Sequence, residues 1–198
     1  STHLPVTVKT RLGWDDNSIN IDEVAERLQD IGVAALSIHA RTRAQMYKGH
    51  SDWSHIARVK NNPRITMPIF GNGDIDSPEK ALEYKNKYGI DGIMIGRAAI
   101  GYPWIFNEIK HFFKTGEHLA KPTVADRVEA VRNHLTWAMD WKGERHGIVE
   151  TRPHYTNYFK GIHSFKTYKQ QLVTLDKPEE LFAVLDEIID AYSGYEVV

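Results

Sequence analysis

The residues best suited to chemistry lie where two short apolar segments end. Gly96 and Arg97 follow the apolar stretch 92–95, and the string Gly-Asn-Gly-Asp occupies 71–74 after another such stretch. Glycines let backbone amides approach an anion closely, and a guanidinium binds phosphate through two parallel hydrogen bonds. A helix that begins after Arg97 would add its dipole. The predicted phosphate cradle therefore consists of Asn72, Gly73, Asp74, Gly96 and Arg97.

Each of the two preceding apolar segments carries a group that could face the same ligand. Lys9 lies in the alternating stretch 5–14, on the face opposite Val8, and His39 shares a face with Ser37. Taken alone, such a lysine is as often a solvent-facing side chain, and such a histidine is more often a satisfied core group. In combination with the glycine-rich strand ends, they favour a cofactor that carries a phosphate.

Four strand–helix units are expected to position these residues. Apolar residues alternate along the predicted strands and recur every three or four positions along the predicted helices. Ser77 before Pro78 is typical of a helix start, because the hydroxyl can cap free amides and proline suits the first turn. The expected strands lie within 5–14, 33–40, 67–74 and 89–96, and the expected helices within 21–32, 52–62, 77–89 and 97–113.

This alternation predicts an α/β fold with a parallel sheet, in the form of a (β/α) barrel or a doubly wound sheet. In both architectures, ligands bind at the carboxyl ends of the strands. In a barrel, the cradle after the last two strands is the place where phosphates commonly bind.

The second part of the chain loses the strand pattern. Residues 123–192 show helical spacing, with Thr123 as a cap, and residues 115–122 are expected to be the linker. We therefore predict two domains, a partial barrel over 1–120 and a small all-helical domain over 121–198.

The composition excludes several functional classes. A formal net charge of -1 provides no global attraction to nucleic acid, and the absence of cysteine excludes disulfides, thiolate metal sites and a cysteine nucleophile within these residues. No apolar run is long enough for a membrane span, and the first residues lack the pattern of a signal peptide. No metal site is predicted, and a cytoplasmic protein is the expectation.

One local stretch is basic. Residues 142–170 carry six lysines and arginines against two glutamates, with five tyrosine and phenylalanine residues between them, whereas 174–198 is strongly acidic. The basic stretch suits phosphate contact, and the rings suit base stacking. A solvated helix with one buried face is the commoner explanation of such a pattern. The residues proposed to contact RNA are Arg152, Lys160 and Lys166, with Arg41 and Arg43 at the rim of the sheet.

Several strings, in this order, resemble the tRNA dihydrouridine synthases, in particular the bacterial branch. They are VTVKTRLGW, HARTR, IFGNGDI and GIMIGRAAIGYPWIF, followed by a helical tail with RPHYTNYFKG. The resemblance implies an FMN-dependent (β/α)8 barrel followed by a helical tRNA-binding domain. It also implies that NADPH is the reductant and that uridine in tRNA is reduced to 5,6-dihydrouridine.

The resemblance assigns roles by motif. Lys9 would contact the flavin ring, and His39 would contribute to the flavin site. The ribityl and phosphate groups would be held by Asn72, Gly73, Asp74, Gly96 and Arg97.

The chain departs from the family pattern in one respect. Only four strand–helix units precede the helical tail, so the fold expected is the C-terminal half of a (β/α)8 TIM barrel followed by a small all-helical domain. The family's Asn-x-Gly-Cys-Pro motif, which carries the catalytic cysteine, does not occur. We therefore expect no catalytic residue in this chain and an inactive isolated fragment.

Two other functions stay open at this point. One is an FMN-dependent barrel oxidoreductase acting on a small molecule, which would not need a basic helical tail. The other is a non-enzymatic RNA-binding fragment. Four parallel strands also leave two unpaired edges, so self-association of the fragment through these edges is expected.

Overall fold

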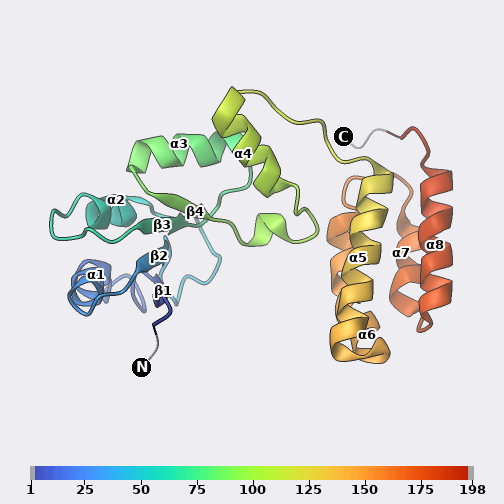
Figure 1. Cartoon of the computed structure of the whole chain (residues 1–198), viewed down its shortest axis with the longest axis horizontal. Coiled ribbons are helices and arrows are strands. Elements are labelled where there is room, and N and C mark those ends of the chain that lie inside the picture. The colour runs from blue at the N-terminus through green and yellow to red at the C-terminus, as the bar shows by residue number, and fades with distance from the viewer. Residues whose placement is uncertain (1–2, 196–198) are drawn as a thin grey trace. The chain divides into compact units, whose positions relative to one another are not determined.

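The computed structural model describes residues 3–195. Its first unit alternates strands and helices, and its second unit consists of helices (Figure 1). In chain order the elements are β1 (Thr7–Arg11), α1 (Ile21–Asp30), β2 (Ala35–His39), α2 (Ser54–Lys60), β3 (Ile69–Asn72), α3 (Pro78–Tyr88), β4 (Gly92–Met94), a 3-10 turn η1 (Arg97–Ala99), α4 (Ile105–Thr115), α5 (Val124–Lys142), α6 (Glu144–Tyr158), α7 (Lys166–Thr174) and α8 (Pro178–Ala191).

The contacts divide the chain into two compact units. The first comprises residues 1–98 and 107–117, and the second comprises 99–106 and 118–198. The short segment 99–106 therefore belongs to the unit of helices α5 to α8, although residues 98 and 107 on either side of it belong to the first unit. Each unit has a hydrophobic core of its own.

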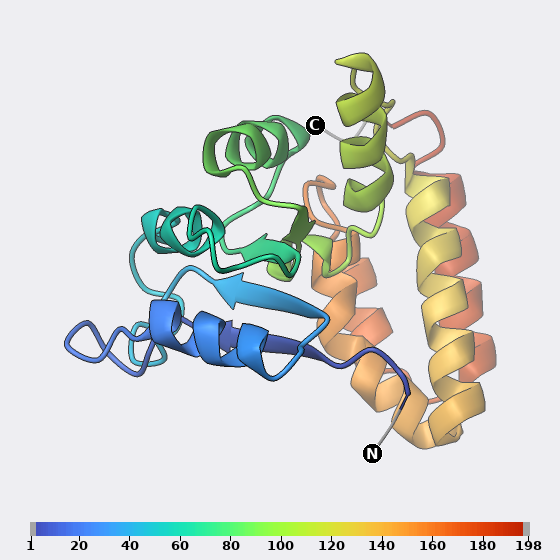
Figure 2. The same ribbon diagram turned by 60° about the vertical axis from the view of Figure 1, so that its left-hand side comes forward.

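The first unit is an α/β fold with a parallel four-stranded sheet in the order β1-β2-β3-β4. Helices α1 to α3 follow one another along one face of the sheet (Figure 2). On that face lie Leu36, Ile38 and Ile69, which are fully buried. Gly71 belongs to the same face, and a Cβ there would lie 2.0 Å from the Trp53 ring. The indole of Trp53 thus needs a glycine on β3.

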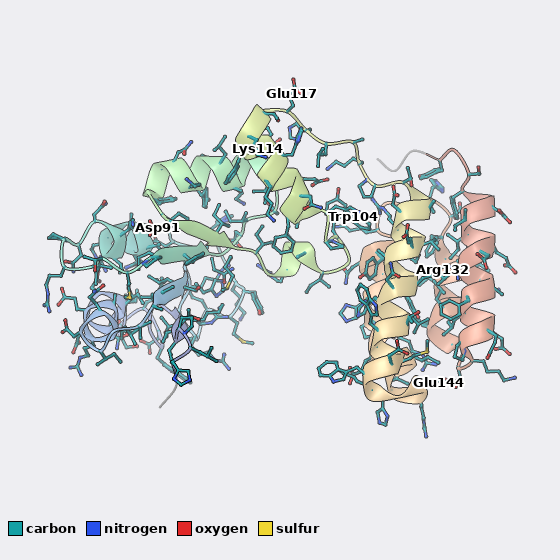
Figure 3. All side chains as sticks on the ribbon, in the orientation of Figure 1. Asp91, Trp104, Lys114, Glu117, Arg132 and Glu144 are labelled. Atoms are coloured by element: carbon teal, nitrogen blue, oxygen red, sulfur yellow. The ribbon has the colours of Figure 1, made fainter. Side chains whose placement is uncertain are left out.

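Local signals explain the helix and strand ends in this unit. The Ser77 hydroxyl accepts a hydrogen bond from the Lys80 amide at 3.2 Å, and Gly89 ends α3 with a φ of +62°. Asp91, just before β4, accepts hydrogen bonds from the Ile69 amide at 2.8 Å and from the Lys60 ammonium (Figure 3). The predicted serine cap is therefore confirmed, and Asp91 fastens α2 to the strands.

The helix expected over 97–113 is not continuous. After β4 the chain makes only the three-residue turn η1, and α4 begins at Ile105. Gly101, with a φ of +69°, and Pro103 lie between the two. A glycine in the left-handed region and a proline interrupt the amide ladder, so the helical pattern cannot be continuous there.

The second unit packs α5, α6, α7 and α8 around one apolar core. Thr123 and Asp126 form a reciprocal capping box at the start of α5, so the predicted Thr123 cap is confirmed. Gly147 lets α6 approach α5 closely, because a Cβ there would lie 2.5 Å from the Met139 amide nitrogen. On α5, Arg132 donates to the Phe182 carbonyl at 3.2 Å and pairs with Asp186, which ties α8 to α5 (Figure 3).

Candidate functional site

The face of the sheet opposite α1 to α3 carries polar groups in two rows. The strand register aligns Lys9 with Ser37 in one row, and it aligns Arg11, His39 and Asn72 in the next row toward the carboxyl ends. Neighbouring strands in register point aligned side chains to the same face. The sequence prediction that Lys9 and His39 share a face is therefore confirmed.

Lys9 and His39 differ in their exposure. The Lys9 side chain is exposed, and partial burial together with the nearby Arg11 charge lowers its pKa. His39 is buried, and its pKa is lowered to about 4 by burial and by the charges of Arg11, Lys9 and Arg41, against the opposing effect of Asp74. His39 is therefore neutral at pH 7 and can accept as well as donate a hydrogen bond.

The turn after β3 has a conformation that suits glycine. Gly73 has a φ of +132°, and a Cβ there would lie 2.9 Å from Ser51 and 3.3 Å from the His39 ring. Its carbonyl accepts a hydrogen bond from the Trp53 indole at 3.1 Å. The side-chain amide of Asn72 donates to the Met94 carbonyl at 2.7 Å. This hydrogen bond links the end of β3 to the end of β4.

Asp74 is the most heavily bonded of the predicted site residues. Its two carboxylate oxygens accept from both terminal nitrogens of Arg41, at 2.9 and 2.7 Å, from the Ser51 amide at 2.9 Å and from Arg97 at 3.2 Å. Burial would raise the pKa of Asp74, but the hydrogen bonds from Arg41 and Ser51 and the Arg41 charge outweigh it and lower the pKa to about 2. The carboxylate is thus occupied by protein donors.

Arg97 lies at the end of β4, in the first position of η1. Its side chain is 55% exposed, with one bond to Asp74 and its Cζ 4.5 Å from the centre of the Tyr47 ring. Most of its donors are therefore free to meet a ligand. The predicted helix dipole at this position is wrong, because the turn η1 has only three residues. A Cβ at Gly96 would touch nothing, so the space in front of it is open.

The two arginines predicted at the rim of the sheet differ. Arg41 is 2% exposed, and its guanidinium binds Asp74 and the carbonyls of Lys48 and Gly49. Its predicted role as an RNA contact is wrong, because a buried guanidinium with all these partners cannot reach a phosphate. Arg43 is exposed, and its role stays a prediction.

Two residues of this region were absent from the predicted site. Arg11 donates to the carbonyls of Thr42 and Met46 at 2.8 and 3.1 Å. The centre of the Tyr47 ring lies 5.8 Å from the Arg11 Cζ and 4.5 Å from the Arg97 Cζ. The signal for Arg11 was present, because it is two positions after Lys9 on the same strand. Tyr47 follows no strand-end rule, and only the fold of the loop after β2 brings it to Arg97.

Two of the six lysines and arginines of the basic stretch 142–170 are paired with carboxylates. Arg152 donates to the Leu175 carbonyl at 2.9 Å and to Asp176 at 2.6 Å, and Lys142 pairs with Glu150. Lys160 and Lys166 are exposed, and no carboxylate partner of either occurs within residues 3–195. These two lysines are therefore the accessible cations among the three residues predicted on the helical tail.

The predicted stacking rings of this stretch are wrong for the most part. Tyr155, Tyr158, Phe159 and Phe165 are buried in the core of the helical unit, and Tyr168 packs against that core. The exposed rings of these helices are instead Trp137 and Trp141 on α5, at 69% and 84% exposure. Helical spacing of the aromatics in 155–168 indicated a core face, and this signal outweighs their proximity to lysines.

Among residues 3–195, no helix has the length and apolar character that a membrane crossing requires. The same part of the chain holds no group of three or more histidine or acidic side chains arranged for a metal ion.

The chain was compared with known proteins. A family model described as dihydrouridine synthase (Dus) matches residues 1–193. A probable tRNA-dihydrouridine synthase 1 from Synechocystis is 44% identical over 186 residues, which cover 94% of this chain and 52% of the relative. The tRNA-dihydrouridine synthase B of Shewanella oneidensis is 37% identical over 187 residues, which cover 94% and 57%. The chain thus spans about half the length of the curated relatives that it matches.

A solved structure of a mandelate oxidase variant with (S)-mandelic acid covers 91% of this chain with 14% identity and a TM-score of 0.39. This likeness is too distant to bear on the fold.

Proposed function

The chain belongs to the dihydrouridine synthase family, and we propose that it is the part of such an enzyme that binds the phosphate end of FMN and the tRNA substrate. The activity proposed for the whole enzyme is the FMN-dependent, NADPH-linked reduction of uridine to 5,6-dihydrouridine in tRNA. The observation that carries the proposal is the convergence of Lys9, His39, Asn72 and Arg97 on the open face and carboxyl ends of one sheet.

For the architecture, we propose the C-terminal half of a (β/α)8 barrel over residues 1–120 and a helical tRNA-binding domain over 121–198. Four parallel strands in chain order, with helices along one face, are what half of such a barrel contains. The face opposite the helices is the interior of a barrel. In this unit that face carries polar side chains of β1, β2 and β3 beside the apolar Phe70 and Met94, which suits a ligand with polar groups and a ring.

The residues present fit a phosphorylated flavin. Arg97 and the backbone at Gly96 would hold the phosphate, and Asn72 and Gly73 would line the ribityl chain. Lys9 and Arg11 share one face of β1, and their positive charges would stabilise the negative charge of a reduced flavin bound there. His39 is neutral, so it would add a hydrogen bond without adding charge. We assign Asp74 to positioning, because protein donors occupy its carboxylate.

Reduced FMN would supply the hydride that saturates the uracil ring. In the family that the sequence resembles, a cysteine protonates the uracil ring, and these 198 residues contain none. The residues of this chain then bind and orient the cofactor and the RNA, and none of them is proposed as the proton donor. Since tRNA is the substrate, we propose that the enzyme works in the cytoplasm.

For the RNA, we propose contacts from Lys160 and Lys166, with Arg43 as a third cation and Arg152 as a peripheral one. Free cations on exposed positions bind phosphates, and exposed indoles stack on unpaired bases. We add Trp137 and Trp141 on this ground. Replacing both tryptophans with alanine is expected to weaken tRNA binding about tenfold or more, whereas an effect below twofold in gel-shift titrations would remove them from the surface.

Flavin titration tests the cofactor proposal. FMN fluorescence quenching by the chain is expected to give an affinity that falls about tenfold to a hundredfold in Arg97→Ala, because one charge-assisted phosphate contact is lost. Arg64→Ala is the matched control, since its side chain is 58% exposed and it lies before β3, at the opposite ends of the strands. Equal affinities for both variants and the unchanged chain would refute the assignment of Arg97.

The test against a small-molecule oxidoreductase is tRNA binding itself. An enzyme for a small substrate would share Lys9 and Arg97 but would gain nothing from Lys160 and Lys166. Saturable tRNA binding by the chain, sensitive to those lysines, supports the RNA enzyme, and its absence favours the small-molecule alternative.

We also propose that copies of this chain associate through their sheet edges. Within residues 3–195, β1 pairs only with β2 and β4 only with β3, so both edges present unpaired amides. Analytical ultracentrifugation is expected to show a dimer or larger species, and a monomer at all concentrations would contradict the proposal.

A further inference from the structure

Arg41 is a buried cation whose bonds serve the protein alone. Its Nη1 and Nη2 donate to the two oxygens of Asp74 at 2.9 and 2.7 Å. Its Nε donates to the Lys48 carbonyl at 3.2 Å, and Nη2 also donates to the Gly49 carbonyl at 2.6 Å. A fork of this kind fixes both partners in direction as well as in distance.

The first consequence concerns charge. Asp74 faces two guanidinium groups, the buried one of Arg41 and the exposed one of Arg97. Arg41 takes both carboxylate oxygens, whereas Arg97 makes one longer contact of 3.2 Å. The charge of Asp74 is therefore cancelled by Arg41, and the charge of Arg97 remains for a ligand.

The second consequence concerns the loop after β2. The carbonyls that Arg41 holds follow Tyr47 directly in the chain, and the ring of Tyr47 lies 4.5 Å from the Arg97 Cζ. Ser51, farther along the same loop, donates its amide to Asp74 at 2.9 Å. Arg41 thus fastens the loop that carries the packing partner of Arg97.

We propose that Arg41 is a positioning residue that cancels the charge of Asp74 and fastens the 46–52 loop, so that Arg97 keeps an open guanidinium whose positive charge Asp74 does not offset and a phosphate can use. This inference rests on the proposed function in that the phosphate is taken to be that of FMN. It replaces the RNA contact that the sequence predicted for Arg41.

The test compares FMN with riboflavin, which lacks the phosphate. In Arg41→Met, Asp74 is released to pair with Arg97, so FMN affinity is expected to fall about tenfold or more while riboflavin affinity changes less than about threefold. A merely structural role would weaken both flavins equally. Arg58→Met is the matched control, because Arg58 also forms a fork on one aspartate, Asp22, in an exposed position. It is expected to leave both affinities unchanged.

A second variant separates the two roles and guards against unfolding. Arg41→Lys keeps the charge but cannot form the fork, so it is expected to retain the preference for FMN while amide hydrogen exchange within 46–52 becomes at least about tenfold faster. Exchange in β2 and β3 is expected to stay as in the unchanged chain. Loss of the preference for FMN in Arg41→Lys, or unchanged exchange within 46–52, would overturn the proposal.

The two proposals fail in different ways. A chain that binds neither flavin refutes the proposed cofactor site, and hydrogen exchange then decides the inference alone. Faster exchange confined to 46–52 in both Arg41 variants supports it, and equal or global changes overturn it. A parallel loss of FMN and riboflavin binding in a folded Arg41→Met also overturns it.

Discussion

The two units of this chain use their charged residues in different ways. In the sheet unit, Lys9, Arg11 and Arg97 converge on one face and one set of strand ends, and only Arg97 among the three has a carboxylate contact in the described chain. In the helical unit, Arg132 and Lys142 are each bound to an acidic side chain of another helix, and Arg152 is bound to Asp176 in the connection between α7 and α8. The sheet unit thus brings three cations together at one place, whereas these three cations of the helical unit link separate segments of that unit.

This difference follows from geometry. The carboxyl ends of parallel strands all lie at the same edge of the sheet. Polar residues that follow different strands therefore come close together, even when they are far apart in the sequence. Helices distribute side chains around their axes, and a basic residue meets whatever lies on the adjacent helix. Loss of a core residue in one unit should therefore lower the stability of that unit and leave ligand binding by the other unit unchanged.

The largest effects are expected from the two cores. Trp53→Ala removes a ring that is 1% exposed and that holds the Gly73 carbonyl, so it should cost about 3–5 kcal/mol of the unfolding free energy of the sheet unit and abolish flavin binding. Leu135→Ala should cost about 2–5 kcal/mol in the helical unit alone. Urea denaturation with flavin titration measures both. Loss of flavin binding in Leu135→Ala would break the separation of the units.

A smaller effect is expected at two close approaches. In Gly73→Ala, the new Cβ would lie close to Ser51 and His39, at a position whose φ is +132°. In Gly147→Ala, the new Cβ would lie 2.5 Å from the backbone of α5. Each should lower stability by about 1–3 kcal/mol, because neither backbone site can relax freely. Only Gly73→Ala should weaken FMN binding, as measured by fluorescence titration. Equal flavin affinities in the two variants would show that the turn after β3 is not part of the site.

The pH dependence of the unfolding free energy should reveal the lowered pKa of His39. Its pKa is about 4 in the folded chain and ordinarily about 6.5, so between these values the unfolded chain binds the proton and the folded chain does not. The unfolding free energy should therefore fall as pH decreases from 7 to 5, by about 1–2 kcal/mol. Urea denaturation of the unchanged chain and of His39→Asn at pH 7 and pH 5 measures this decrease in the unfolding free energy. His39→Asn should lose this part of the decrease, and equal decreases in both proteins would contradict the assigned environment.

The smallest effect is expected on RNA binding. Lys160→Ala combined with Lys166→Ala should weaken tRNA binding about threefold to tenfold and reduce the slope of log affinity against log salt by about 1 to 2, since two phosphate contacts are lost. The control pair Lys110→Ala and Lys114→Ala lies on α4, where both lysines are also exposed. Filter binding at several salt concentrations measures the slopes. A change of the same size in the control pair would contradict the proposal that Lys160 and Lys166 of the helical unit contact tRNA.

Much of the sheet unit could be predicted from the sequence. Alternation predicted the shared face of Lys9 and His39, and Gly71, Gly73 and Gly96 marked the regions where β3 and β4 end. These signals are local and depend on the backbone alone. The role of Asp74 and Arg41 was not predictable in this way, because their pairing joins positions 33 residues apart through the fold of a loop.

The helical unit was harder to interpret. A count of lysines and arginines in 142–170 says nothing about which of them face an acidic neighbour, and Arg152 is taken by Asp176 from outside the stretch. The aromatic residues between them have helical spacing, and the structure buries Tyr155 and Phe159. The helical spacing of these aromatic residues therefore predicted their burial, whereas the count of basic residues did not show which cations are accessible.

The central claim is that the strand ends of the sheet unit hold the phosphate of FMN. Nuclear magnetic resonance of the 15N-labelled chain during FMN titration tests it most directly. We expect the amides of 72–74 and 96–98 and the Arg97 side chain to shift in a saturable manner, with those of α5 to α8 unchanged. Shifts confined to α5 to α8, or none at all, would contradict the claim.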